Sequence, residues 1–282
     1  MALDAFLLII LSAFIQATWN FVAKKSSANR AVLIYVGWFM VGLITLPAAS
    51  LVTDFSNFSP TWLYFIISSS VIHIAYVAFL GWGYAKGDIS MVYPIARGVG
   101  IAGTTIVALF ISVDVALCGI LGIICITSGT ALIGLRESFR KESQHAFFIA
   151  VGTGIIVAAY SIVDSAAVKT VPPLFYVAAI NLIPAVLAAP ILLLRYRPEV
   201  GIVLRTHKKE SFFVAAAGTV AYVLILYAFQ KTPAAYVVAL REFSVVIAAG
   251  LGVVVLKEKL YKRKIIAIVL ILVGMVIIKL AN

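Results

Sequence analysis

The chain has 282 residues, of which 63% are hydrophobic and 12% charged, whereas a soluble domain carries about 25% charged residues. The apolar residues form long uncharged runs without alternation, which excludes a soluble globular fold and a membrane β-barrel. The net charge of +11 comes from Lys and Arg beside the apolar runs, which favours anchoring at a membrane surface over nucleic-acid binding.

Ten apolar stretches follow one another along the chain, with short loops between them. A helix needs about 20 apolar residues to cross ~30 Å of hydrocarbon, and most of the stretches reach that length. The sequence therefore predicts an all-α polytopic membrane protein of ten transmembrane helices in a lipid bilayer. We place the helices at residues 3–23, 31–53, 61–85, 89–111, 115–134, 146–169, 174–194, 211–230, 233–256 and 263–280.

The loops between the stretches divide by charge. Of the 22 Lys and Arg residues, 17 lie in the loops after the odd-numbered stretches and three lie on the other side. Because cytoplasmic loops carry the excess of Lys and Arg, we expect the odd-numbered loops in the cytoplasm and both termini outside, in a bacterial inner (plasma) membrane. The start of the chain lacks the basic segment of a cleavable signal, so we expect the first span to stay.

An inverted internal repeat accounts for this charge pattern. Residues 1–142 and 143–282 each hold five predicted spans, and an odd number of spans forces the two halves into opposite orientations. Such repeats are typical of secondary transporters, whose substrate site lies near the midplane between the halves. Three matches at offsets of 144 to 146 support the repeat: Gln16, Asn20 and Lys25 with Tyr160, Asp164 and Lys169; Ala75-Tyr76-Val77 with Ala221-Tyr222-Val223; and Lys86, Val92 and Arg97 with Lys231, Val237 and Glu242.

Several segments resemble one transporter family. They are GDISMVYPIAR at 87–97, TPAAYVVALRE at 232–242, Leu256-Lys257-Glu258 after the ninth span, and ATWN at 17–20 in the first span. Together they are similar to the ten-helix, EamA-type branch of the drug/metabolite transporter superfamily, and the likeness covers essentially the whole chain. The resemblance implies transport of small metabolites through a central cavity, often export of amino acids or related compounds.

Ionisable groups inside spans are costly and are therefore functional candidates. Arg97 follows Tyr93 and Pro94, and it either offers its guanidinium to a carboxylate or phosphate in the cavity or clamps a neighbour such as Glu242. Arg241 and Glu242 are adjacent on a helix, so at most one of them faces the cavity squarely. Glu242 either forms a structural ion pair with Arg97 or opens that pair when substrate or protons arrive.

Other polar side chains in the spans are candidates for the cavity. Asp164 suits proton coupling or binding of an amino group, or it caps a neighbour at the water interface. His73 is either a packing residue or a proton carrier, and Asn20 is a candidate ligand because of its place in the repeat. Tyr76, Tyr93, Tyr160 and Tyr222 could wall a cage for an ammonium group, or belong to interfacial belts.

We expect a secondary active transporter that works by alternating access, with hinges at proline and glycine in the fourth and ninth spans. The polar inventory suits export of a small zwitterion such as an amino acid, with protons as a possible coupling ion. The first alternative is a carrier of organic anions or of phosphate or phosphonate esters. The second is a non-transporting membrane scaffold. Sequence motifs of nucleotide, metal or acyl-transfer chemistry are absent, so we expect no enzyme activity, cofactor or metal.

Overall fold

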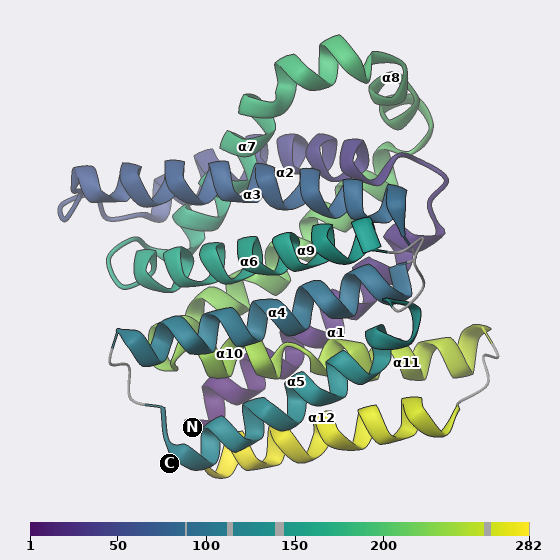
Figure 1. The fold of residues 1–282 in the computed structure, drawn as a ribbon. Coiled ribbons are helices and arrows are strands. Elements are labelled where there is room, and N and C mark those ends of the chain that lie inside the picture. The colour runs from purple at the N-terminus through teal and green to yellow at the C-terminus, as the bar shows by residue number, and fades with distance from the viewer. Residues whose placement is uncertain (88, 112–114, 139–143, 257–260, 282) are drawn as a thin grey trace.

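The computed structural model describes residues 1–282 except 88, 112–114, 139–143, 257–260 and 282, and the described part is helical without strands. Most of the helices run side by side along one direction (Figure 1). Their bounds are α1 Leu3–Lys25, α2 Arg30–Val52, α3 Pro60–Lys86, α4 Ile89–Phe110, α5 Leu117–Ser138, α6 Gln144–Ala167, α7 Pro173–Arg195, α8 Arg197–Thr206, α9 Lys208–Lys231, α10 Ala234–Leu240, α11 Phe243–Leu256 and α12 Lys262–Leu280.

Local sequence signals set several helix ends. The side chain of Asn29 accepts hydrogen bonds from the backbone N–H groups of Ala31 and Val32, which caps the start of α2. Ser59 caps α3 in the same way, and Pro60 follows at a position where its missing N–H costs nothing. Pro94, in contrast, lies inside α4 without ending it.

Two elements differ from the sequence prediction. The ninth predicted span is divided into α10 and α11, with the break at Arg241 and Glu242, and Pro233 only precedes α10. The second difference is α8, which lies in a segment treated as a basic loop. Its ten residues would reach only about 15 Å, too short to cross a bilayer, and its start at Arg197-Pro198 is a typical helix beginning.

Eight helices of the described chain are long and apolar enough to cross a membrane: α1, α2, α3, α4, α6, α7, α9 and the stretch Ala234–Leu251 of α10 and α11. The apolar stretch described for α5, Leu117–Ile133, is shorter. The chain is therefore an all-helical integral membrane protein. The predicted repeat boundary at residues 142 and 143 lies outside the described residues, as do Asp88, Lys257 and Glu258 of the family-like segments.

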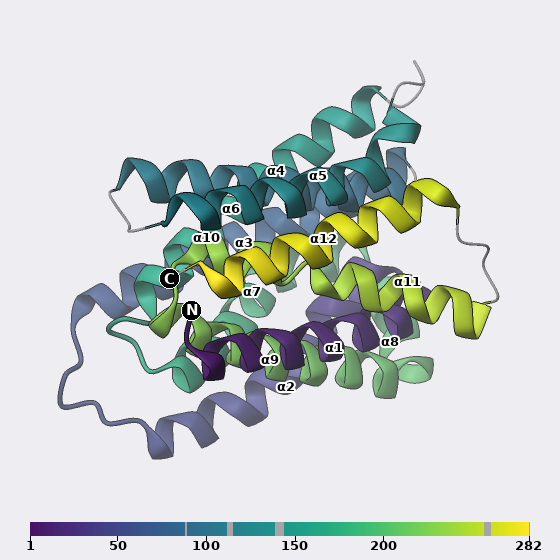
Figure 2. The same cartoon turned by 90° about the horizontal axis from the view of Figure 1, so that it is seen from below.

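The helices pack in pairs drawn from the two parts of the chain (Figures 1 and 2). α1 packs against α9 and α11, and α6 packs against α3 and α4. α2 packs against α7, and α5 against α12. The α5–α12 contact is close because Gly122 faces Gly274, and a Cβ on Gly122 would lie 2.7 Å from the carbonyl oxygen of Gly274. Small residues at such crossings let helix backbones approach in lipid.

Candidate functional site

A cavity of about 460 Å³ lies between the helices and gathers most of the polar side chains singled out in the sequence. Its lining comes from α1, α2, α3, α4, α6, α7 and α9 and from the region of the α10–α11 break, with one residue each from α5 and α12. Eight of the ten predicted site residues line it: Asn20, His73, Tyr76, Tyr93, Arg97, Tyr160, Tyr222 and Arg241. Asp164 and Glu242 are fully buried behind it.

The cavity extends from the middle of the bundle toward one end. α1 and α3 contribute residues of their C-terminal halves, whereas α2, α4 and α9 contribute residues of their N-terminal halves. Because these helices alternate in direction, all of these residues lie on the same side of the bundle centre. The lining continues to Arg30, Tyr84 and Lys264. These residues lie near the ends of α2, α3 and α12, where the predicted cytoplasmic loops join the helices.

Arg97 and Glu242 form a buried ion pair beside the cavity. Arg97 is 4% exposed and Glu242 is 0% exposed. The Nε of Arg97 donates a hydrogen bond of 2.6 Å to Oε1 of Glu242, and Nη2 lies 2.6 Å from the same oxygen. Tyr93 lies under the guanidinium, with its ring centroid 6.0 Å from Cζ. The charge of Arg97 is therefore matched by a carboxylate from the other half of the chain.

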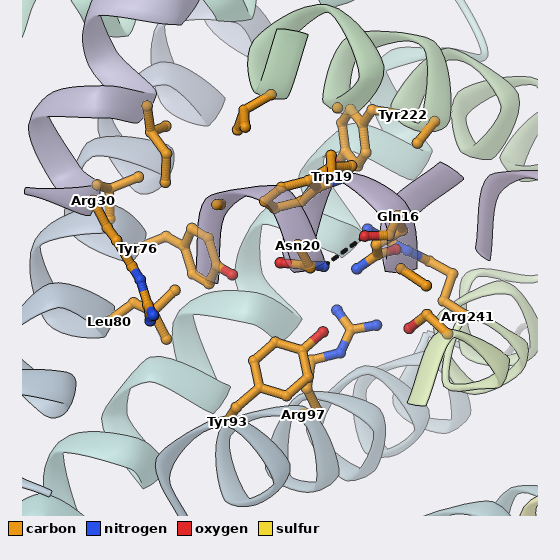
Figure 3. Close-up of a pocket in the computed structure, with 18 of the residues that line it drawn as sticks. Gln16, Trp19, Asn20, Arg30, Tyr76, Leu80, Tyr93, Arg97, Tyr222 and Arg241 are labelled. Atoms are coloured by element: carbon orange, nitrogen blue, oxygen red, sulfur yellow. Dashed lines mark hydrogen bonds between the residues drawn. The ribbon is translucent and has the colours of Figure 1, made fainter. Parts of the chain in front are cut away.

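Arg241 lines the same cavity and forms no ion pair with any acidic residue that the structure describes. Its residue is 7% exposed, and its buried Nε has no hydrogen-bond partner within the described chain. The guanidinium carbon lies 5.4 Å from the centroid of the Tyr222 ring, a cation–π distance. Figure 3 shows the guanidinium groups of Arg97 and Arg241 pointing into the cavity from different helices. Of the adjacent pair Arg241 and Glu242, it is thus the arginine that faces the cavity.

The break between α10 and α11 places these two residues. Around the break the backbone forms hydrogen bonds between residues three apart, as in a 3₁₀-helix. They run from Glu242 N to Ala239 O at 3.0 Å and from Ser244 N to Arg241 O at 3.1 Å. A short stretch of this kind in the middle of a helix often marks a functional hinge. The change of pitch turns Arg241 toward the cavity and Glu242 toward α4.

Aromatic rings form much of the cavity wall. The His73 ring lies 4.7 Å from that of Tyr160 and 6.1 Å from that of Tyr222, and Tyr160 lies 5.6 Å from Tyr76. On α1, Asn20 donates its side-chain N–H to the carbonyl oxygen of Gln16 at 2.9 Å, so its amide oxygen is left for another donor (Figure 3). The wall therefore combines ring faces with a few hydrogen-bonding groups, as small-molecule sites do.

Asp164 does not line the cavity, but it accepts a hydrogen bond from Tyr222, which does. Its Oδ1 accepts hydrogen bonds from Ser69 Oγ and from the Tyr176 hydroxyl, both at 2.6 Å, and its Oδ2 accepts one from the Tyr222 hydroxyl. These donors come from α3, α7 and α9. The expectation that Asp164 could cap a neighbour at the water interface is wrong, because the residue is 0% exposed.

The opposite end of the bundle is closed by packing and by polar contacts. Lys169 donates to the last carbonyl groups of α9, Phe229 O at 2.8 Å and Gln230 O at 2.9 Å. Lys231 pairs with Asp4, and Lys279 donates to Met1 O at 2.9 Å, which brings the two chain termini together (Figure 2). A buried hydrophobic cluster fills the space between these contacts and the cavity.

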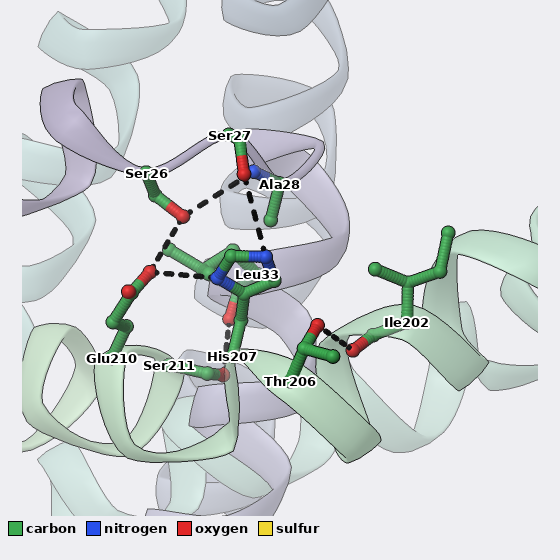
Figure 4. A network of polar contacts seen from close by, with 9 residues as sticks. All are labelled: Ser26, Ser27, Ala28, Leu33, Ile202, Thr206, His207, Glu210 and Ser211. Carbon is green, nitrogen blue, oxygen red and sulfur yellow. Dashed lines mark hydrogen bonds and ion pairs between the residues drawn. The ribbon is translucent and has the colours of Figure 1, made fainter.

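At the end toward which the cavity extends, a polar network joins the turn after α1 to the start of α9 (Figure 4). Ser26 Oγ donates to Glu210 at 2.7 Å, and Glu210 lies 3.0 Å from Nδ1 of His207. Ser211 donates to Leu33 O at 2.7 Å. The network fastens α9 to α1 and α2 beside the cavity mouth.

Sequence reasoning did not assign several cavity residues to the site. Gln16, Trp19 and Asn181 also line the cavity. The side chain of Asn181 donates a hydrogen bond of 2.8 Å to Thr219. Ser69 could have been found from its spacing of four residues before His73, but no pattern in the sequence points to Tyr176.

The comparisons with known proteins agree with this fold. Residues 145–280 match the EamA-like transporter family. A protein of known crystal structure superposes with a TM-score of 0.77 at 18% sequence identity, over 99% of this chain and 98% of that chain, which shows the fold alone. A search of curated protein sequences found no match. Residues 145–280 are therefore similar to an EamA-like transporter domain, which agrees with the resemblance of the chain to the drug/metabolite transporter superfamily.

Proposed function

We propose that this protein is a secondary active transporter that carries a small polar metabolite with an anionic group across the membrane by alternating access. The observation that carries the proposal is Arg241, a buried arginine that faces the cavity without an acidic partner in the described chain. A guanidinium that faces the cavity without a counter-charge is placed to bind an anionic group of a ligand. A non-transporting scaffold would have no use for such a cavity.

The arrangement of helix neighbours supports two inverted five-helix halves, residues 1–142 and 143–282, and hence ten spans. Exchanging α1 with α6, α2 with α7, α3 with α9, α4 with the α10–α11 pair, and α5 with α12 turns the main packing pairs described above into other observed pairs. The contact of α1 with α9 becomes that of α6 with α3, and the contact of α4 with α6 becomes that of α11 with α1. The α2–α7 and α5–α12 contacts map onto themselves. Only α8 has no counterpart.

The lining favours an anionic group on the substrate. Among the described residues of the lining, Arg30, Arg97, Arg241 and Lys264 carry positive charge, and there is no Asp or Glu. The guanidinium of Arg241 can hold a carboxylate by two parallel hydrogen bonds. An ammonium group could rest on the faces of Tyr76, Tyr160 and Tyr222. An amino acid is therefore the first candidate substrate.

The charge bias of the loops supports export. It places the end toward which the cavity extends in the cytoplasm and both termini outside, in an inner or plasma membrane. In this state the site would face the cytoplasm, where a metabolite to be exported is bound. At the other end, the buried hydrophobic cluster and the ion pair of Lys231 with Asp4 would form the closed barrier on the outer side.

A thermal-shift screen of the purified protein with L-amino acids and organic anions tests the proposal. A ligand that binds only the folded protein raises its apparent stability, by about 2.7 kcal/mol at a hundredfold excess over Kd. We expect Arg241→Met to weaken binding of the best ligand by about ten- to a hundredfold, since a hydrogen bond to a charged group contributes about 1.5–3 kcal/mol. Arg195→Met, at the exposed end of α7, is the matched control.

Unchanged affinity in Arg241→Met, or a best ligand that is a cationic amine without an anionic group, would contradict the proposal. The second candidate function, a carrier of organic anions or phosphate esters, is favoured by the lack of a carboxylate in the described lining. It would replace the first if dicarboxylates or phosphate esters stabilise the protein and amino acids do not. Uptake into proteoliposomes then measures transport of the best ligand directly.

A further inference from the structure

Asp164 is a fully buried carboxylate that is satisfied by hydroxyl groups alone. Three hydroxyl groups donate to it, those of Ser69, Tyr176 and Tyr222, and no cation of the described chain forms an ion pair with it. Glu242, equally buried, has Arg97 as its partner. Hydroxyl donors solvate a carboxylate without cancelling its charge, and they can rotate to suit a carboxyl group that holds a proton. Asp164 is thus the buried acid whose charge only a proton would remove.

Two hydrogen-bonded routes connect Asp164 with the cavity. The first is direct, because the Tyr222 hydroxyl donates to Asp164 and the Tyr222 side chain lines the cavity. The second passes through Ser69, whose Oγ lies 2.6 Å from Oδ1 of Asp164 and 3.1 Å from Nδ1 of His73. Nδ1 of His73 also lies 2.9 Å from the carbonyl oxygen of Ser69, which can only accept, so this nitrogen carries the hydrogen.

The internal repeat predicts where Asp164 lies when the cavity opens at the other end of the bundle. Its counterpart in the first half is Asn20, and the counterparts of Tyr222 and Leu226 are Tyr76 and Leu80. Asn20, Tyr76 and Leu80 all line the present cavity. If the two halves exchange their environments, Asp164, Tyr222 and Leu226 would line a cavity that opens at the other end.

We propose that Asp164 is the proton-binding site of this transporter, connected in turn to the two sides of the membrane; this rests on the alternating-access function proposed above. On the present side, a proton from the cavity binds Nε2 of His73. The proton on Nδ1 of His73 passes to Ser69 Oγ, and the Ser69 hydroxyl proton passes to Oδ1 of Asp164. One proton enters at the histidine and one is bound at the carboxylate, so only N–H and O–H bonds change.

The titratable groups near Asp164 come from four helices, and the two arginines of this region make their contacts elsewhere. His73 and Ser69 face it from α3, Tyr176 from α7 and Tyr222 from α9, while Tyr160 lies one turn before it on α6. From α4, Arg97 turns to Glu242. Arg241, after α10, contacts the ring of Tyr222 on the cavity side. An anion bound to Arg241 would therefore sit on one side of Tyr222 and Asp164 on the other, which places substrate and proton in contact through one residue.

Infrared difference spectroscopy of the protein in lipid vesicles tests the site without any substrate. On lowering the pH, we expect a C=O stretching band of a protonated carboxyl group to appear in the wild type. The band should be lost in Asp164→Asn and kept in Glu242→Gln, the matched buried acid. Absence of the band in the wild type, or its survival in Asp164→Asn, would overturn the proposal.

Transport in proteoliposomes gives the second readout, with the best-binding metabolite of the screen. The wild type should accumulate it when a pH gradient is imposed. Asp164→Asn should still exchange internal for external metabolite but lose this accumulation, and accumulation at the wild-type level would overturn the proposal. Asp54→Asn removes an exposed acid in the loop after α2 and should retain both exchange and accumulation. Loss of exchange together with accumulation in Asp164→Asn would mean that Asp164 is a structural anchor, and it would overturn the proposal. If the wild type transports nothing, the proposed function fails, and the infrared titration still decides the proton site.

Discussion

Removing Arg97 from the Arg97–Glu242 ion pair should destabilise the protein more than removing Glu242. Arg97→Met leaves Glu242 at 0% exposure with no counter-charge and no path to water. Removing one partner of a buried ion pair costs about 3–5 kcal/mol. For a chain of this size 1 kcal/mol corresponds to roughly 2–4 °C in Tm, so we expect a decrease of roughly 6–20 °C. Glu242→Leu should cost less, because Arg97 lines the cavity and can turn toward water there.

Melting curves from intrinsic fluorescence measure these effects, since the chain has four Trp residues. The double variant Arg97→Met/Glu242→Leu should melt close to the wild type, because an apolar pair of similar volume commonly replaces a buried ion pair at no cost. Arg195→Met, on the exposed end of α7, controls for loss of an arginine. A double variant as unstable as Arg97→Met alone, or a larger loss in Glu242→Leu than in Arg97→Met, would refute the reasoning.

Three further outcomes are expected in the same melting assay. Gly122→Val should destabilise the α5–α12 contact by about 1–3 kcal/mol, because its Cβ would press on the Gly274 carbonyl oxygen; a wild-type Tm would show that the two helices separate without cost. Asn181→Ala removes the hydrogen bond to Thr219 and should cost only ~0.6 kcal/mol, so a large loss would mean that the amide holds more than this contact. Asp4→Asn breaks the exposed pair with Lys231 and should leave Tm unchanged at every salt concentration, and a salt-dependent decrease would contradict this.

Helix positions were largely predictable because the bilayer sets the length of each apolar run. The predicted starts and ends differ from α1, α2, α3 and α7 by no more than two residues. The exceptions are two features that the hydropathy of the sequence does not predict. α8 is a short helix of mixed polarity, and the break at Arg241 and Glu242 lies inside a stretch that reads as one span.

The candidate site was predictable as a set of residues but not as a set of partners. Spacing on one helix places His73, Tyr76 and Leu80 on a common face, and all three line the cavity. Which of two adjacent side chains turns inward depends on the local pitch, which the sequence does not specify at Arg241 and Glu242. Contacts between side chains of different helices, such as the hydrogen bond from Tyr176 to Asp164, leave no periodic signal in the sequence.

The hinge expected at proline and glycine shows the same division. Pro94 and Pro233 suggested bends because proline removes a backbone donor. In the structure α4 continues through Pro94, while the break between α10 and α11 lies at Arg241 and Glu242, directly after Leu240. The expected hinges in the fourth and ninth spans stay a prediction, and the break at Arg241 and Glu242 is the structural feature to which the second of them can be assigned.

Alternating access between two inverted halves is the central claim, and paired cysteine reporters test it most directly. With Cys118 and Cys125 replaced, Leu80→Cys reports on the present cavity and Leu226→Cys, its 0% exposed counterpart, on the closed side. In oriented vesicles, a membrane-impermeant maleimide should reach position 80 from the cytoplasmic face and position 226 from the outer face. The transported metabolite should change the two rates in opposite directions. Rates that rise or fall together, or a cysteine at 226 that never reacts, would contradict the account.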